Sequence, residues 1–150
     1  MNTVSQDQSD RWGLAPSLDE FAALAEQAFE SLPEGFRRLT GAILFRVDEF
    51  ATDEVLTSLG IENPFDLTGL YSGVDLGLRS VMDPVLEPSR VFLYRRPILD
   101  EWTERGDVTL LDLITHVLVH EIGHHFGLSD EAMEAIEAGL DGPEPATYLA

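Results

Sequence analysis

Apolar residues recur at the 3.6-residue spacing of an α-helix in three stretches of the chain. The first covers residues 17–32 and begins with Ser17 and Glu20, which match the capping-box pattern. The second and longest covers residues 109–127. The third covers residues 129–140. The pattern therefore predicts three amphipathic helices, one near the start of the chain and two in succession near its end.

Two shorter runs are apolar and rich in β-branched or aromatic residues, which favours strands. They cover residues 42–47 and 91–94. Between them, Thr52 and Gly60 have the positions of an N-cap and a C-cap around a short helix. Residues 64–79 contain three glycines, which indicate turns, bulges or places where two backbones approach closely. The chain thus combines helices with at least two strands.

The longest predicted helix carries the sequence H-E-x-x-H, formed by His120, Glu121 and His124. An α-helix advances about 100° and 1.5 Å per residue, so His124 lies about 40° from His120 and one turn further along. Both imidazoles can therefore bind one ion. Glu121, at about 100°, is placed to contact a water molecule rather than the ion itself. This pattern is typical of a zinc hydrolase site with two histidine ligands and Glu121 as general base.

The opposite face of this helix is apolar, which places the helix against the core of the protein. Thr109 and Asp112 resemble a capping box at its start, although Asp107 is an alternative cap. The apolar residues lie between about 160° and 260° from His120; they are Leu111, Leu118, Val119, Ile122 and Phe126. The first turns are apolar nearly all round, so we expect the last turns alone to open onto a cleft.

A third protein ligand is expected shortly after the helix. Gly127 suits the left-handed residue that ends a helix, and Asp130 follows where a reversing chain can bring a carboxylate back to the metal. Asp130 is also placed to cap the next helix instead. In that case Glu134 or a water molecule would complete the metal site.

All four histidines of the protein lie between positions 116 and 125. His116, one turn before His120, is interpreted as a hydrogen-bonded structural histidine, with metal ligation as the alternative. His125 lies about 140° from His120 and is excluded from the ligands. Gly123 predicts close packing of the helix against another element.

The charge and composition limit the partners. The net charge of −19 argues against nucleic acid, whose phosphates would be repelled, and is interpreted mainly as a solvated surface. Cysteine is absent, so a metal must be bound by histidine and carboxylate groups. We expect a cytoplasmic monomer without membrane segments, folded as one domain over residues 1–150 with mobile tails at 1–16 and 141–150.

Three segments together resemble the small bacterial minimal-zincin metallopeptidase family. They are Val119–Asp130, which contains H-E-x-x-H-x-x-G-x-x-D, the Gly-Leu-Tyr segment 69–74, and residues 91–96. The resemblance covers roughly residues 17–140. It extends to the metzincins through H-E-x-x-H-x-x-G, although Asp130 stands where most of them have a third histidine, and no counterpart of their Met-turn is evident.

The resemblance implies an α+β fold of minimal zincin type, with a small twisted mixed sheet packed on the H-E-x-x-H helix and further helices flanking it. In zinc proteases of this architecture an edge strand beside the metal helix receives an extended peptide by strand addition. Val91–Tyr94 is the candidate for that strand, with an ordinary interior strand as the alternative. Arg95 and Arg96 are expected to pair with acidic side chains of the protein itself.

The function predicted on these grounds is zinc-dependent hydrolysis of peptide bonds in a peptide or protein substrate. His120, His124 and Asp130 bind Zn²⁺, and Glu121 takes a proton from the attacking water and delivers one to the leaving amine. Two alternatives remain open. One is a binding module that keeps the zincin scaffold without turnover, and the other is a narrow regulatory protease acting on one intracellular protein.

Overall fold

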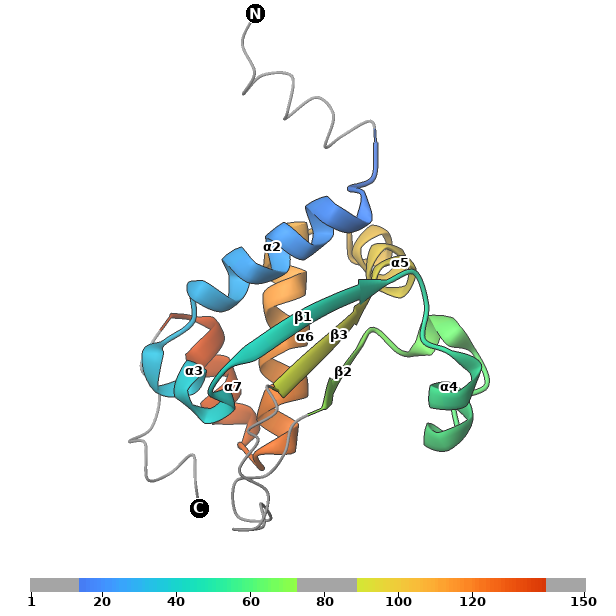
Figure 1. Ribbon diagram of the computed structural model, residues 1–150. Helices are drawn as coiled ribbons and strands as arrows, with labels where there is room; N and C mark the ends of the chain where they lie inside the picture. Colours follow the sequence, from blue (N-terminus) through green and yellow to red (C-terminus); the bar gives the residue numbers. More distant parts are fainter. Residues whose placement is uncertain (1–13, 73–88, 140–150) are drawn as a thin grey trace, which may run out of the picture.

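The structure is a computed structural model, and it describes residues 14–72 and 89–139 (Figure 1). The described residues form six α-helices and a small three-stranded sheet, so the fold is α+β, as predicted. In chain order the elements are α2 (Leu18–Glu30), α3 (Glu34–Thr40), β1 (Ile43–Asp48), α4 (Asp53–Leu59), the 3₁₀ turn η1 (Pro64–Asp66), β2 (Gly69–Ser72), β3 (Ser89–Tyr94), α5 (Arg95–Arg105), α6 (Leu110–His125) and α7 (Asp130–Glu137).

The sheet has the strand order β1-β3-β2, with β1 parallel and β2 antiparallel to β3. The predicted strand at 91–94 is present within β3, but its assignment as the substrate-binding edge is wrong. β3 pairs with β1 through Phe45 and Val91 and with β2 through Tyr71 and Val91, so both of its edges are hydrogen-bonded. The edge strand next to the H-E-x-x-H helix is β2, which lies in the glycine-containing stretch for which the sequence predicts turns, bulges or close backbone approaches.

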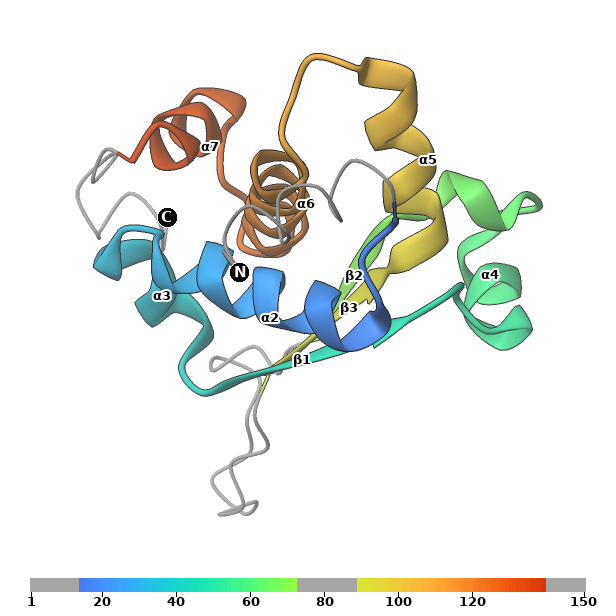
Figure 2. The same ribbon diagram turned by 90° about the horizontal axis from the view of Figure 1, so that it is seen from above.

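Helices α2 and α6 pack on the same face of the sheet, with α2 against β1 and α6 against β2 (Figure 2). They also pack on each other, and α6 contacts α5 and α7 as well, so α6 lies at the centre of the domain. The core between these layers is mostly apolar. Its completely buried large side chains are Phe21, Phe36, Val91, Leu93, Ile98, Leu113, Ile114, Leu118, Ile122, Met133 and Ile136.

Local capping signals gave correct helix boundaries. Ser17 and Glu20 form the predicted capping box, with Glu20 N–H donating to Ser17 Oγ and Ser17 N–H to Glu20 Oε1. Thr52 caps α4, and Gly60 ends it with φ +70°. Two helices were not predicted, α3 and α5, because each begins near a proline that resembles a break: Pro33 is the N-cap of α3, and Pro97 lies in the first turn of α5.

Several expectations concern residues outside the described ranges. They are the expectations for most of the two proposed tails and for Gly73 and Gly77. Pro16 lies near the start of the first described range, and its carbonyl accepts a hydrogen bond from Arg95 Nε over 2.6 Å. Arg95 Nη1 lies 2.8 Å from Glu49 Oε1. That second contact is the predicted pairing of Arg95 with an acidic side chain.

Within residues 14–72 and 89–139, no helix has the length and apolar character needed to cross a membrane.

Candidate metal centre

The H-E-x-x-H motif occupies the last turns of α6, and the end of this helix is fixed by a Schellman motif. Gly127 has φ +72°; its N–H donates to the His124 carbonyl over 3.1 Å, and the Leu128 N–H donates to the Gly123 carbonyl over 2.9 Å. Leu128 is buried beside Gly123. The predicted left-handed residue at Gly127 is therefore confirmed, and it turns the chain back toward α7 immediately after the motif.

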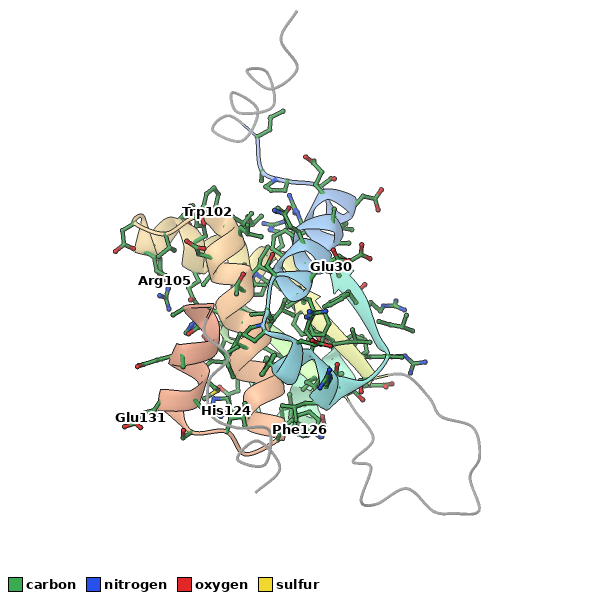
Figure 3. All side chains as sticks on the ribbon, turned by 90° about the vertical axis from the view of Figure 1, so that its left-hand side faces the viewer. Glu30, Trp102, Arg105, His124, Phe126 and Glu131 are labelled. Atoms are coloured by element: carbon green, nitrogen blue, oxygen red, sulfur yellow. The ribbon has the colours of Figure 1, made fainter. Side chains whose placement is uncertain are left out.

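The two motif histidines follow each other along one side of α6. Their ring centroids lie 5.7 Å apart; His120 is partly buried and His124 exposed. Figure 3 shows His124 near the end of α6, on the side of α7. Glu121 is partly buried on a different part of the helix surface, toward β2. Glu121 therefore lies on a different side of α6 from the two histidines, as the helical spacing predicted.

Burial shifts the pKa values of two motif residues, Glu121 and His120. It is the largest cause that raises the pKa of the Glu121 carboxyl above its ordinary value, and the nearby His124 opposes this shift. Burial is also the largest cause that lowers the pKa of His120, followed by its neighbour His116, while Glu137 acts in the opposite direction. The lowered pKa favours the neutral form of His120, which metal ligation requires.

The edge strand β2 lies directly against the side of α6 that carries Glu121. Gly69 packs so closely that an added Cβ would lie 2.9 Å from Val117 Cγ1, 3.2 Å from the Phe92 carbonyl oxygen and 3.5 Å from Glu121 Cγ. The absence of a side chain at Gly69 therefore allows the strand to approach Glu121. The close backbone approach expected in this glycine-containing stretch is confirmed at this position.

Asp130 is the first residue of α7, and it is not the cap of that helix. The N-cap is Ser129, whose Oγ accepts the Ala132 N–H over 3.1 Å. The alternative in which Asp130 is occupied as a cap is therefore wrong, and its exposed carboxylate remains available. Its charge acts on His120, whose pKa it raises slightly against the larger effects of burial and His116.

Within the described ranges, one group of three histidine or acidic residues has ligand atoms that all lie within 4.8 Å of one another, and it is His116, His120 and Glu137. His116 Nδ1 lies 2.5 Å from Glu137 Oε1, and His120 Nε2 lies 3.8 Å from Glu137 Oε2. The structure does not gather His124 and Asp130 into such a group. The interpretation of His116 as a hydrogen-bonded histidine agrees with its contact to Glu137.

Glu137 was missed by sequence reasoning, although a signal for it exists. Asp130, Glu134 and Glu137 are spaced by four and three residues, so they share one side of α7. Only Glu137, of these three, is partly buried; the other two are exposed. The spacing alone does not reveal which carboxylate faces the histidines, because that depends on how α7 packs on α6.

The remaining small and aromatic residues of the motif have structural roles. His125 packs its ring on Tyr71 with centroids 4.7 Å apart, away from His120. Gly123 lies where an added Cβ would be 2.5 Å from Met133 Sδ, so the predicted close packing against another element is confirmed and that element is α7. Phe126 lies on the side of the sheet in Figure 3 and is 5.9 Å from the Tyr71 ring centroid.

The protein has an α+β fold with an H-E-x-x-H helix at its centre. A sheet edge lies beside the glutamate of this helix, and a helix that carries carboxylates follows after a glycine turn. These features define a protein of the zincin class. Comparison with protein families matches residues 40–140 to the zincin-like metallopeptidases, and the chain belongs to that family. No curated protein matches it. Family membership supports a zinc peptidase in general, and the neutral imidazole and carboxylate donors of α6 and α7 suit a divalent ion such as Zn²⁺.

Proposed function

We propose that this protein is a zinc-dependent endopeptidase in which Glu121 is the general base. The observation that carries the proposal is the placement of Glu121 between two features. On the same helix lie the imidazoles of His120 and His124, and on the adjacent edge strand Gly69 lies close to the Glu121 side chain. A base, a pair of metal ligands and a surface for an extended peptide are thus adjacent.

His120, His124 and Asp130 are the residues that would hold the ion. When bound there, zinc polarises a carbonyl and lowers the pKa of a water molecule toward about 7. Asp130 supports this set because Ser129 performs the capping of α7 and the chain reverses at Gly127. Glu134 or water stays the alternative for the third position.

Glu121 performs the proton transfers. Its carboxylate accepts a proton from the water that attacks the peptide carbonyl carbon, and the same carboxyl group then donates that proton to the leaving amine. Burial raises the pKa of Glu121 above its ordinary value. The raised pKa moves the group toward the range in which one carboxyl can act first as base and then as acid near neutral pH.

The substrate is proposed to bind as an extended strand along the free edge of β2. Among the described residues β2 pairs with β3 alone, so its other edge presents unpaired backbone groups beside Glu121. Strand addition supplies main-chain hydrogen bonds that are independent of side-chain identity. A general peptidase and a narrow protease acting on one protein would both use this edge.

The test is peptide cleavage by zinc-loaded protein, followed by mass spectrometry on a mixed peptide library. We expect Glu121→Gln to retain zinc and to lose at least about 100-fold in rate, the lower range of a general base's contribution. Glu131→Gln, on an exposed position of α7, is the matched control and keeps the parent rate. Equal cleavage by Glu121→Gln and the parent would exclude Glu121 as the base, and zinc-loaded parent protein that cleaves no peptide would favour a binding module.

A further inference from the structure

We propose that His116, His120 and Glu137 form a second divalent-metal site, one helical turn before the H-E-x-x-H pair. The site shares His120 with the proposed catalytic centre but uses neither His124 nor Asp130. It would take a borderline ion such as Zn²⁺, Co²⁺ or Ni²⁺, because two imidazoles and one carboxylate are its donors.

The geometry of the three side chains is close to that of ligands around one ion. Glu137 presents its two oxygens to different histidines, Oε1 at 2.5 Å from His116 Nδ1 and Oε2 at 3.8 Å from His120 Nε2. Two donors at about 2.0–2.1 Å from a tetrahedral zinc ion lie roughly 3.4 Å apart. The His120–Glu137 pair is already near that separation, and the His116–Glu137 pair needs to open by less than about 1 Å.

The histidine rings are arranged compatibly with this site. The centroids of His116 and His120 lie 4.0 Å apart with their planes tilted by 38°, so the two rings are neighbours on one face of α6. Glu137 reaches them from the last turn of α7, which packs against α6. The three ligands thus come from two helices whose relative position is fixed by the buried contact between Gly123 and Met133.

An ion can reach the site from solvent. An open depression of about 340 Å³ borders His116 and Glu137, with Asp112 and Arg105 also on its wall. The side chains of His116 and Glu137 are 39% and 22% exposed. Arg105, visible at the end of α5 in Figure 3, is paired with Glu101 over 2.9 Å, which offsets its positive charge near the entrance.

Sharing of His120 has a consequence for regulation. Because the Nε2 atom of His120 has one lone pair, it can bind one ion at a time. An ion in the upstream site therefore removes His120 from the catalytic pair, and excess zinc would inhibit peptidase activity. This consequence rests on the proposed function, whereas the existence of the upstream site does not.

The experiment measures Zn²⁺ affinity, by competition with a chromophoric chelator, in a His124→Ala background that lacks the catalytic pair. We expect this variant to bind one Zn²⁺ per chain. Adding Glu137→Gln or His116→Gln should each weaken binding by at least about 10-fold, whereas adding Asp130→Asn should not change it. Circular dichroism verifies that each variant is folded, and the two separate ligand substitutions guard against loss of one variant through misfolding.

Two results would overturn the proposal. One is a folded His124→Ala protein that binds no zinc. The other is binding that weakens with Asp130→Asn and not with Glu137→Gln or His116→Gln, which would place the ion with the remaining catalytic ligands. Neither result bears on the peptidase assignment, because that is tested by Glu121→Gln in a chain with both motif histidines intact.

Discussion

Replacing Gly69 with alanine tests the contact that brings β2 against the H-E-x-x-H helix. The added Cβ would lie 2.9 Å from Val117 Cγ1 and 3.2 Å from the Phe92 carbonyl oxygen, whereas carbon atoms pack favourably at about 3.5–4.0 Å. Val117 is buried, and its β-branched side chain has one preferred rotamer in a helix. The Phe92 oxygen belongs to the central strand of the sheet. Neither neighbour can move without displacing a helix or a strand.

The expected change in the free energy of unfolding on Gly69→Ala follows from two opposing effects. Removing a glycine from a strand normally stabilises a protein by about 0.5–1 kcal/mol. Overpacking a tight contact costs roughly 1–3 kcal/mol. We therefore expect Gly69→Ala to lower the free energy of unfolding by about 1–2 kcal/mol, a change opposite in sign to the one strand propensity alone predicts.

The measurement is urea unfolding followed by far-UV circular dichroism, with Val117→Ala as the partner in a double-mutant cycle. Val117→Ala alone should cost about 2 kcal/mol for its two buried methyl groups and the space they leave. In the double variant the contact with Val117 Cγ1 is removed and that with the Phe92 oxygen remains, so the total loss should fall short of the sum by about 1 kcal/mol. A Gly69→Ala protein at least as stable as the parent, or strictly additive losses, would refute the contact.

Two further predictions concern Gly127, in the turn after the motif, and Tyr71, in the edge strand β2. Gly127→Ala should destabilise the protein by about 1 kcal/mol, because φ is +72° at this position. Gly127→Asn should lose less stability, because asparagine tolerates this conformation. Equal thermal stability of the two variants would contradict a backbone requirement at this turn. Burial raises the pKa of Tyr71 above its ordinary value of 10.0, so its contribution to stability is present below about pH 10 and is lost as the pH rises through the folded-state value. Tyr71→Phe removes the 2.8 Å hydrogen bond to Ser89 and should lower the free energy of unfolding by roughly 1 kcal/mol at pH 7. Above pH 10 the free energy of unfolding of this variant should fall less steeply than that of the parent, because only the contribution of Tyr94 remains. An unchanged alkaline slope would contradict this role of Tyr71.

The parts of the fold that could be predicted are those specified by local sequence. The capping pair Ser17 and Glu20, the caps around α4 and the left-handed Gly127 each depend on a few adjacent residues, and each appears as expected. The placement of the motif side chains on α6 also follows from helical periodicity alone. These features require no knowledge of what packs against them.

The parts that were missed depend on contacts between distant segments. β2 has four residues and includes Gly69, so its strand conformation comes from pairing with β3 rather than from propensity. The central place of β3 is a property of strand order, which no local pattern specifies. Glu137 reaches His116 only because Gly123 lets α7 pack tightly against α6, so its role follows from helix packing.

The proposed catalytic metal site is tested most directly by an anomalous-difference map at the zinc edge, from crystals of the protein loaded with one equivalent of Zn²⁺. We predict one peak bonded at about 2.0–2.1 Å to nitrogens of both His120 and His124, with a carboxylate oxygen of Asp130 as third ligand and Glu121 outside bonding distance. A peak that His124 does not contact, or the absence of any bound zinc, would contradict the assignment of this helix as the catalytic centre.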